Sequence, residues 1–535
     1  MRRARGLLVL CCLVVMLGST AAATAGADAS GGHSGGGRGD WPSWQGDPTG
    51  SRFNRAEHRI TPATVGRLKL KWAFAYPKTG AWTKSQPAVV GDDVFFGGPD
   101  RMFYAVDART GKQKWRFDMG PARPTPPDGG VAFNGATGAA VADGKVFFGD
   151  SNGYVYALDQ RTGKLVWRVQ TEDHPRGWHT SSPLYHKGRI YIGSSSNEHG
   201  VDQKYPCCTF RGHIDSLDAA TGALVWRRYT VPEPKPVGTW PSGSTRYEPS
   251  GAGVWGSPVI DEATGTLYVG TGQNYSGNGG DFDTLFALDA ATGAVRWKQQ
   301  VTDADSWRDL CNFPDGEGYC PGLKDNTALD FDLGSTPNLF PVHGRLLVGV
   351  GQKSGVYHAF DARTGKVRWR RQLSVPSPLG GATGIQWGAS YDGTHLYAAT
   401  YYAGPGTLNA LDPATGKVVW TTPNPADGCT RGGAAQYPQQ CVLAHTPAVT
   451  SSPGLVYEGS TDGKMRVYSA RTGAVLWEYD TVRDFDGVNG IPGRGGSIAG
   501  NGGAVVAHGT LYVQTGYEPM YPSERGNVLL AFDLP

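Results

Sequence analysis

The chain has 535 residues, of which 79 are glycine and 16 are tryptophan, and only 18% are charged. This composition favours many short strands joined by tight turns, and it argues against coiled coils, long helical bundles and charge-rich disorder. The net charge of +3 spread over this length gives no indication of a nucleic-acid-binding surface.

The first 25 residues have the pattern of a secretory signal peptide. Three arginines lie within residues 1–5, an apolar run covers residues 7–18, and small residues follow. This run is too short for a membrane span, and no later stretch is long enough, so we expect none. Residues 26–40, rich in Gly and Ser, are expected to form a flexible linker, and residues 41–535 a single domain. We therefore expect the cleaved protein to be secreted or otherwise extracytoplasmic.

One repeated unit organises the rest of the chain. It consists of a strand, a D-x-x-T-G turn and a second strand that ends in Trp, as in FYAVDARTGKQKW at residues 103–115. Seven copies occur, with Ser469 in place of Asp in the seventh, and a half-copy, VLLAFD, ends at Asp533. The half-copy lacks its second strand, and a matching strand lies near the N-terminus around Trp72. Seven copies and this completed half-copy give eight expected units. This pattern predicts an all-β, eight-bladed β-propeller whose N- and C-terminal strands close one blade. We expect the repeated tryptophans to pack between blades rather than to bind a ligand.

The cysteine count favours disulfides. Two of the eight cysteines lie in the signal peptide, and six remain, an even number for an oxidising compartment. Their spacing favours the pairs Cys311–Cys320 and Cys429–Cys441 and leaves the neighbours Cys207 and Cys208 for each other. Free or cross-paired thiols at residues 207 and 208 are the alternative. The motif C-x-x-C-H is absent from the sequence, so no covalent haem is expected.

The unit A-x-D-x-x-T-G-x-x-x-W resembles the repeat of the pyrroloquinoline quinone (PQQ) dehydrogenases, and the resemblance covers residues 40–535. The opening segment WPSWQGDPTGSRF is also similar to the start of their catalytic domains. Non-catalytic envelope scaffold propellers share this repeat, so the function depends on residues outside it.

Two motifs near the third repeat resemble cofactor-binding segments of that family. The pattern T-x-x-P, strand, G-x-S-x-x-E implies that Thr180 contacts the quinone and that Glu198 binds a metal ion as a hard oxygen ligand. The string CCTFRG implies a ring of Cys207 and Cys208 on one face of the quinone, with Arg211 pairing with a cofactor carboxylate. This string looks most like that of polyvinyl-alcohol dehydrogenases and their relatives.

Two further segments resemble family motifs. One supplies the residue on the opposite face of the quinone, and the other supplies a metal ligand. Trp255, which lies outside the repeat, corresponds to a Trp that stacks beneath the quinone. The family motif G-[ST]-G-N, whose Asn amide oxygen binds the metal, reads GTGQN here. Gln273 therefore occupies the usual Asn position and Asn274 follows it, and both are candidate ligands. On a strand the two side chains would face opposite ways.

The long insertion after the fourth repeat supplies the remaining candidates. The resemblance of DFDLGSTP and GQKSG implies that Asp330 is the catalytic base and that Lys353 contacts the quinone oxygens. Asp332 is the competing base, or an additional metal carboxylate that would favour a lanthanide. Gln386 and Trp387 lie where quinoproteins have an Asn-Trp pair near the cofactor. A W-D motif like that of methanol dehydrogenases is poorly matched, because Arg308 follows Trp307.

The resemblance implies an oxidoreductase that converts alcohol or sugar hydroxyls to carbonyls with PQQ and a bound cation, Ca²⁺ by default. Secondary alcohols, diols and polyvinyl-alcohol-like polymers are the expected substrates. Electrons would pass to a separate cytochrome, copper protein or quinone. A non-catalytic exported propeller that acts as an envelope scaffold or binding protein is the main alternative. A propeller hydrolase or lyase is a more distant one, since no carboxylate spacing selects a glycosidase pair.

Overall fold

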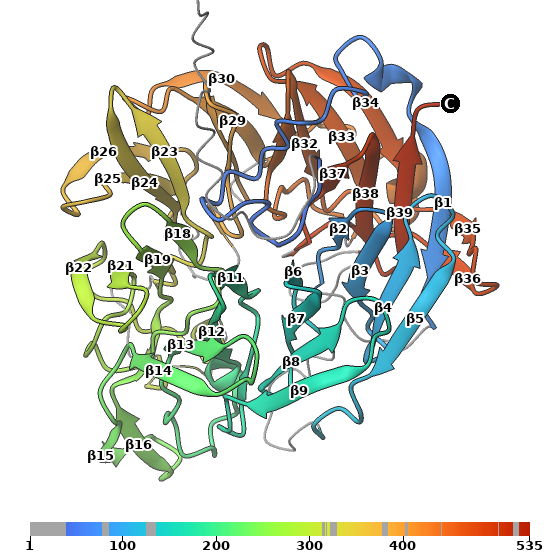
Figure 1. Cartoon of the computed structure of the whole chain (residues 1–535). Helices are drawn as coiled ribbons and strands as arrows, with labels where there is room; N and C mark the ends of the chain where they lie inside the picture. Colours follow the sequence, from blue (N-terminus) through green and yellow to red (C-terminus); the bar gives the residue numbers. More distant parts are fainter. Residues whose placement is uncertain are drawn as a thin grey trace, which may run out of the picture. The chain divides into compact units, whose positions relative to one another are not determined.

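The computed structural model describes residues 39–77, 85–124, 135–312, 316, 318–320, 329–376, 383–401, 405–439, 441–500, 502–516 and 524–535. The predicted signal peptide and all but the last two residues of the predicted linker lie outside the described residues. Eight antiparallel sheets, each built on four strands, follow one another along the chain as the blades of a propeller (Figure 1). The predicted eight-bladed, all-β fold is therefore confirmed.

In the first four blades the strands follow one another from the innermost to the outermost. Blade 1 contains β2 (Ala88–Val90), β3 (Asp93–Gly97), β4 (Met102–Asp107) and β5 (Gln113–Asp118). Blade 2 contains β6 (Ala140–Ala142), β7 (Lys145–Gly149), β8 (Tyr154–Asp159) and β9 (Leu165–Gln170). Blade 3 contains β11 (Leu184–His186), β12 (Arg189–Ser196), β13 (His213–Asp218) and β14 (Leu224–Tyr229), with β10 (Gly177–Trp178) paired to β12. Blade 4 contains β18 (Val259–Asp261), β19 (Thr266–Gly270), β21 (Thr284–Asp289) and β22 (Val295–Gln300).

The last four blades follow the same order. Blade 5 contains β23 (Asn338–Val342), β24 (Arg345–Gly351), β25 (Val356–Asp361) and β26 (Val367–Gln372). Blade 6 contains β27 (Ser390–Tyr391), β28 (Leu396–Ala399), β29 (Thr407–Leu411) and β30 (Val418–Pro423). Blade 7 contains β31 (Thr450–Ser452), β32 (Leu455–Gly459), β33 (Lys464–Ser469) and β34 (Val475–Asp480). Blade 8 contains β37 (Val505–Ala507), β38 (Thr510–Thr515), β39 (Val528–Asp533) and β1 (Lys69–Ala75).

In the part of the chain that the structure describes, three two-stranded sheets and four short 3-10 helices lie in the connections. The sheets pair β15 (Lys235–Thr239) with β16 (Thr245–Glu248), β17 (Ser250–Gly251) with β20 (Asn274–Ser276), and β35 (Asp484–Asp486) with β36 (Pro492–Arg494). The helices are η1 (Val65–Arg67), η2 (Glu198–Gly200), η3 (Asp309–Asn312) and η5 (Gly432–Gln436). Among the described residues, no helix is both long enough and apolar enough to pass through a membrane.

The repeated unit joins each blade to the next. In the first copy, Asp107 accepts hydrogen bonds from the backbone N–H and the hydroxyl of Thr110, which fixes the turn. Trp115 then donates from its indole nitrogen to the carbonyl of Gln160 in the next blade, at 3.0 Å. Gly163 (φ +68°) lies against this indole, where a Cβ atom would come within 2.5 Å of the ring. The equivalent indole bond occurs at every blade junction, from Trp72, Trp115, Trp167, Trp226, Trp297, Trp369, Trp420 and Trp477. The repeated tryptophans are therefore structural, as predicted.

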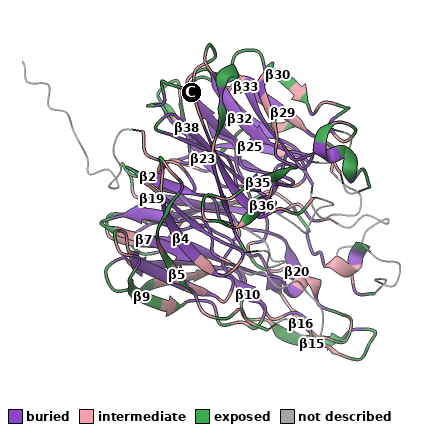
Figure 2. Cartoon of the chain, turned by 90° about the vertical axis from the view of Figure 1, so that its right-hand side faces the viewer, coloured by how far each residue is buried: buried purple, intermediate pink, exposed green. Residues whose placement is uncertain are grey.

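The hydrophobic core is distributed between neighbouring blades. Buried side chains of blades 4 and 5 form one cluster, for example, and those of blades 7 and 8 another. Figure 2 shows that the strands are largely buried, whereas exposed residues gather in turns and connections. Blade 8 closes the ring, because β1 pairs with β39 from Lys69↔Asp533 to Ala75↔Val528. This pairing confirms the predicted closure by strands from both ends of the chain.

A segment near the N-terminus, residues 41–54, forms a strap across the inner strands. Its backbone or side chains hydrogen-bond to the innermost strands of seven blades, through Val89, Val141, Ile260, Leu339, Tyr391, Ser451 and Val506. The buried guanidinium of Arg52 bonds to the carbonyls of Trp44 and Val449 and to the side chains of Gln86 and Thr450. The strap also holds Trp44 against Trp387, with ring centroids 6.5 Å apart. Trp387 in turn contacts Trp255, so the strap supports this pair of tryptophans.

Candidate active site

Lys353 and two aspartates form the centre of the candidate site. Asp330 and Asp332 lie in the segment that precedes β23, and Lys353 follows β24. The Lys353 ammonium lies 2.9 and 3.0 Å from the two carboxylate oxygens of Asp330 and 2.5 Å from the nearer oxygen of Asp332. Both aspartates are buried. The structure thus brings together the predicted base, its competitor and the predicted quinone-contacting lysine.

Burial and neighbouring charge set the protonation of this group. Burial raises the pKa of Asp330 well above its ordinary value; Lys353 opposes the shift, and the carboxylates of Asp332 and Asp305 add to it. Burial alone would lower the pKa of Lys353, but Asp330 and Asp332 outweigh it and the pKa is raised. Lys353 therefore stays charged, beside a carboxylate whose proton affinity is increased.

The indole of Trp255 lies directly below this cluster. The Lys353 ammonium is 5.6 Å from the Trp255 ring centroid, and Trp387 meets the same ring edge-on at 4.8 Å. A Cβ atom at Gly334 would come within 1.6 Å of the Trp255 indole, so only glycine fits there. The Thr180 hydroxyl lies 3.4 Å from the Trp255 carbonyl oxygen and 2.8 Å from the hydroxyl of Ser195. The predicted residues Thr180, Trp255 and Trp387 therefore lie together.

Gln273, Asn274 and Gln386 differ in what they contact. Gln273 donates from its backbone N–H to Asp332 at 2.5 Å, and its side-chain amide, with nitrogen toward Asp332, also donates to that carboxylate. Asn274 points elsewhere and donates to the carbonyls of Gly277 and Gly279. The Asn274 side-chain oxygen is buried and has no hydrogen-bond partner among the described residues. Gln386 is buried, and its amide nitrogen lies 3.4 Å from the Thr383 carbonyl oxygen.

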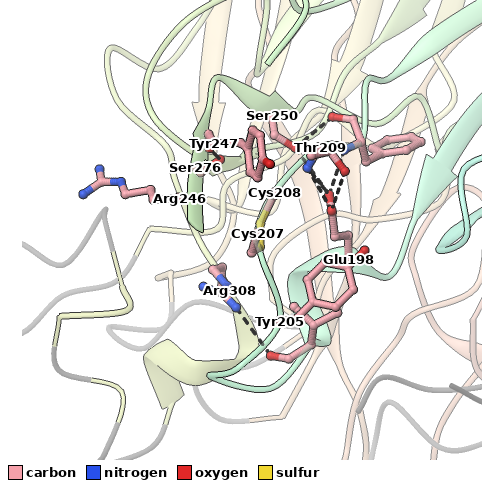
Figure 3. Close-up of a disulfide and its surroundings, with 12 residues drawn as sticks. Glu198, Tyr205, Cys207, Cys208, Thr209, Arg246, Tyr247, Ser250, Ser276 and Arg308 are labelled. Carbon is pink, nitrogen blue, oxygen red and sulfur yellow. Dashed lines mark hydrogen bonds between the residues drawn. A yellow bond between two sulfur atoms is a disulfide. The ribbon is translucent and has the colours of Figure 1, made fainter. Parts of the chain in front are cut away.

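Glu198 is fully buried at the start of η2. Its carboxylate accepts hydrogen bonds from the backbone N–H groups of Thr209 and Phe210, at 2.8 Å each, and lies 3.6 Å from the imidazole of His174 (Figure 3). Burial alone would raise the pKa of Glu198, but His174 and the two N–H groups outweigh it and the pKa is lowered. Glu198 is therefore a carboxylate held in its charged form.

Cys207 and Cys208 form a disulfide that lies close to Glu198 (Figure 3). Both cysteines are buried, and the carbonyl of Cys207 accepts a hydrogen bond from the Trp240 indole at 2.9 Å. The pairs Cys311–Cys320 and Cys429–Cys441 are also bonded, so all three predicted disulfides are present.

The Arg211 side chain contacts Tyr229 and Val231. Its guanidinium lies 3.7 Å from the ring centroid of Tyr229 and donates to the Val231 carbonyl at 3.2 and 3.1 Å. Among the described residues the Arg211 guanidinium makes no hydrogen bond to Trp255 or Lys353, and its role toward a cofactor carboxylate stays a prediction.

Sequence reasoning missed two buried carboxyl groups beside the cluster. Asp305 accepts a hydrogen bond from the backbone N–H of Phe331 at 2.6 Å. Burial, followed by the charge of Asp332, raises the pKa of Asp283 to about 8. Asp305 lies in the TDADSWRDL stretch, whose match to the family motif is poor, and Asp283 stands just before a repeat strand with no motif of its own. Their burial is a property of the fold, and no local pattern in the sequence reveals it.

Two family models match the chain. The one described as "Glucose/ethanol/alcohol dehydrogenase, beta-propeller domain" matches residues 41–312, and the one described as "Outer membrane protein assembly factor BamB" matches residues 352–533. A polyvinylalcohol dehydrogenase from a Pseudomonas species is 34% identical over 513 residues, which cover 92% of this chain and 77% of the relative. A second polyvinylalcohol dehydrogenase, from a Sphingopyxis species, is also 34% identical, over 92% of this chain and 76% of the relative. The chain belongs to the PQQ-dependent alcohol dehydrogenase family.

Solved structures agree with the fold of this PQQ-dependent alcohol dehydrogenase. The quinohemoprotein alcohol dehydrogenase of Comamonas testosteroni aligns with a TM-score of 0.67 at 20% identity, over 93% of this chain and 81% of that chain. A europium-containing methanol dehydrogenase aligns with a TM-score of 0.66 at 19% identity, over 93% and 98%. At these identities the alignments support the propeller fold alone.

The residues present fit a planar, negatively charged quinone better than they fit a metal ion. The half-buried Trp255 ring offers an aromatic face, and the Lys353 ammonium lies over it. For a metal, no group of three or more His, Cys, Asp or Glu side chains in the described part of the chain is arranged to hold one. The buried carboxylate of Glu198 and the unpartnered oxygen of Asn274 are the oxygen atoms most suited to a hard cation.

Proposed function

We propose that this PQQ-dependent enzyme oxidises secondary alcohols, diols or polyvinyl-alcohol-like polymers to carbonyl compounds and passes the electrons to a separate acceptor. The convergence of Asp330, Asp332 and Lys353 above the Trp255 ring carries the proposal. Two relatives that are 34% identical are named polyvinylalcohol dehydrogenases, which supports a hydroxyl-bearing chain as the substrate.

Different residues of the chain take up the proton, stabilise charge and orient the cofactor. When bound, PQQ supplies the two-electron acceptor for the hydride that leaves the substrate carbon. Asp330, whose pKa is raised by burial, accepts the hydroxyl proton as general base. Lys353 remains positively charged and stabilises negative charge that develops on an oxygen beside it. The Trp255 ring provides a flat apolar face that orients a planar ring, and Trp387 meets it edge-on and helps to exclude water.

A bound cation is part of the proposal. Calcium is the default hard cation for carboxylate and amide oxygens, and Asp332 offers a further carboxylate that would favour a trivalent lanthanide. Glu198 and Asn274 are the proposed ligands, with Gln273 and Asp330 as the other candidates. Separate substitution of Gln273 and Asn274 by Ala should show which amide matters, because only the ligand's loss should raise the cation concentration required for activity.

We also propose that the protein acts outside the cytoplasm and delivers electrons to a cytochrome, a copper protein or a quinone. The apolar run near the N-terminus supports export, and the sequence offers no haem-attachment motif. The scaffold alternative draws on the match of residues 352–533 to the BamB model. That match covers repeat units, whereas Glu198, Trp255 and Asp330 lie outside both the repeat and the matched range.

Reconstitution tests the proposed function. Apo protein is mixed with PQQ, Ca²⁺ or a lanthanide, an artificial electron acceptor and a panel of alcohols that includes polyvinyl alcohol. We expect dye reduction only when PQQ and a hard cation are both present, together with a near-ultraviolet absorption band of the bound quinone. Full activity after exhaustive chelation and without PQQ would sink the assignment, and a protein that binds no PQQ would favour the scaffold alternative.

A further inference from the structure

Arg308 is a buried arginine that forms no ion pair with any described residue. Its exposed fraction is 1%, and its Nε and Nη1 atoms have no hydrogen-bond partner among the described residues. The remaining nitrogen, Nη2, reaches the Val201 carbonyl only at 3.5 Å. No carboxylate of the described residues lies within ion-pair distance of the guanidinium. A buried cation with unused donors is unfavourable unless a ligand completes its hydrogen bonds.

The surroundings of Arg308 connect it to the candidate site. The guanidinium lies over the Trp240 ring, 5.0 Å from its centroid, and the Trp240 indole donates to the Cys207 carbonyl. Figure 3 shows Arg308 beside the Cys207–Cys208 disulfide. Burial lowers the pKa of Arg308 to about 10, and Glu198 is the first among the carboxylates that oppose this shift. The cation therefore lies in the environment that holds Glu198 and the disulfide.

The backbone around Arg308 is fixed by its neighbours. Trp307 donates from its backbone N–H to the carbonyl of Asn274 at 2.9 Å, and Cys311 donates to the carbonyl of Arg308 at 2.8 Å. Cys311 is in turn bonded to Cys320. The backbone that carries Arg308 is thus held by β20 on one side and by a disulfide on the other, which favours a preformed binding group.

Arg211 provides the contrast. The resemblance assigns a cofactor carboxylate to Arg211, but its guanidinium already donates twice to Val231 and lies over Tyr229. Arg308 has the same chemistry, lies beside the same disulfide and retains free donors. A guanidinium holds a carboxylate in a bidentate manner through Nε and Nη2 or through Nη1 and Nη2. In Arg308 the Nε and Nη1 atoms are unused among the described residues, and Nη2 is engaged only by the 3.5 Å contact with the Val201 carbonyl, so either pair can turn to a ligand.

We propose that Arg308 binds a carboxylate of the quinone cofactor. The inference rests on the proposed function, because it requires PQQ to be the cofactor. The partner is identified by its chemistry, a planar ring system that carries carboxylates.

Binding to the apo protein tests the inference without any measurement of turnover. Calorimetric titration with PQQ and with its trimethyl ester is compared for the wild type and Arg308→Gln. We expect the wild type to prefer PQQ to the ester, and the substitution to weaken PQQ binding roughly 10–100-fold while leaving ester binding nearly unchanged. Equal loss for both ligands, or no loss for PQQ, would overturn the assignment. If the wild type binds no PQQ, the proposed function fails as well, so the two failures are distinguishable.

Thermal unfolding of the apo protein distinguishes ligand binding from a structural role. Since Arg308 forms no ion pair with a described residue, Arg308→Gln should leave the apo melting temperature unchanged or raise it. A fall together with intact PQQ affinity would contradict the proposal. Arg466→Gln is the matched control, because Arg466 is equally buried but is paired with Asp462 and Glu478. It should lower the melting temperature and leave PQQ affinity unchanged. Arg308→Lys, which keeps the charge but loses the paired donors, should bind PQQ with intermediate affinity.

Discussion

The ammonium of Lys353 contacts both carboxylates that compete for the role of base, so proximity to Lys353 does not separate them. Their other contacts do. Asp332 also receives hydrogen bonds from Gln273, which fix its orientation and use its oxygen lone pairs. A carboxylate held in this way is suited to positioning or ligation. Burial raises the pKa of Asp330, which makes Asp330 the better proton acceptor.

Asp330→Asn should lower turnover by roughly 10²–10⁴-fold, because the substitution preserves size but removes the proton acceptor. Quinone binding, followed by absorbance, should persist. Asp332→Asn should change cation preference or affinity more than the chemical step. Near-normal turnover of Asp330→Asn, combined with loss of turnover in Asp332→Asn with both ligands bound, would reverse the two roles.

The raised pKa of Asp330 also predicts a pH dependence. The base must be deprotonated to act, so kcat should rise with pH through an apparent pKa above the ordinary value for aspartate. Steady-state kinetics across the acidic and neutral range provide the measurement, with Asp330→Asn as the control that should lack this limb. A flat profile of the wild type would contradict Asp330 as the base.

Some residues of this site can be predicted from the sequence, and others cannot. Thr180, Trp255, Asp330 and Lys353 lie in motifs whose order along the chain resembles that of a known family, and the structure brings them together. The position of Arg211, the pairing state of Arg308 and the burial of Asp283 depend on contacts between segments distant in sequence. No local pattern encodes those contacts, so they could be found only in the structure.

At the scale of a single strand, ion pairs shift the pKa of one carboxylate, that of Glu478 on β34. Its carboxylate pairs with Arg431 and, at 2.7 Å, with Arg466. Burial raises the pKa of Glu478, but the two guanidinium groups outweigh it, and the pKa falls to about 2. Since the folded pKa lies below the unfolded value, the stabilisation is complete above about pH 4.5 and is lost as pH falls toward 2.

Glu478→Gln should therefore be less stable than the wild type at pH 7, and the difference should shrink as the pH is lowered below about 4.5. Urea unfolding at several pH values measures it. A difference that stays constant down to pH 2.5 would show that the carboxylate charge makes no contribution.

The two longer disulfides differ in what they support. Replacing both cysteines of either pair by Ser should lower the free energy of unfolding by about 2–3 kcal/mol, because the unfolded chain is less restricted. The Cys311–Cys320 variant should in addition weaken quinone binding, since Cys311 bonds to the backbone of Arg308. The Cys429–Cys441 variant is the control for this second effect. Equal quinone affinity of both variants would mean that this disulfide does not position Arg308.

On the scale of the whole molecule, the strap of residues 41–54 connects blades that are not neighbours. The repeat alone predicts blades and their order, because each indole bond joins only adjacent units. The strap has no repeat signature, and only its resemblance to the start of the family's catalytic domains marks its segment in the sequence. Its contacts with seven blades make the propeller more cooperative than a chain of units that interact only with their neighbours.

Arg52 is the residue of the strap with the most partners, and its removal should be costly. Arg52→Met leaves buried acceptors from several blades without donors, so the free energy of unfolding should fall by about 3–5 kcal/mol. Chemical denaturation, followed by both tryptophan fluorescence and circular dichroism, should still show one coincident transition. Arg363→Met, at an exposed turn of blade 5, is the control and should change stability little.

The pairing of β1 with β39 also affects the timing of folding in the cell. The ribosome makes β1 early and β39 more than 450 residues later. At roughly 5–20 residues per second, β1 waits on the order of 20–90 s for its partner. Until then blade 8 cannot form, and the unpaired edge of β1 can associate with other nascent chains. Production of the protein should therefore benefit from conditions that lower the number of chains synthesised at once.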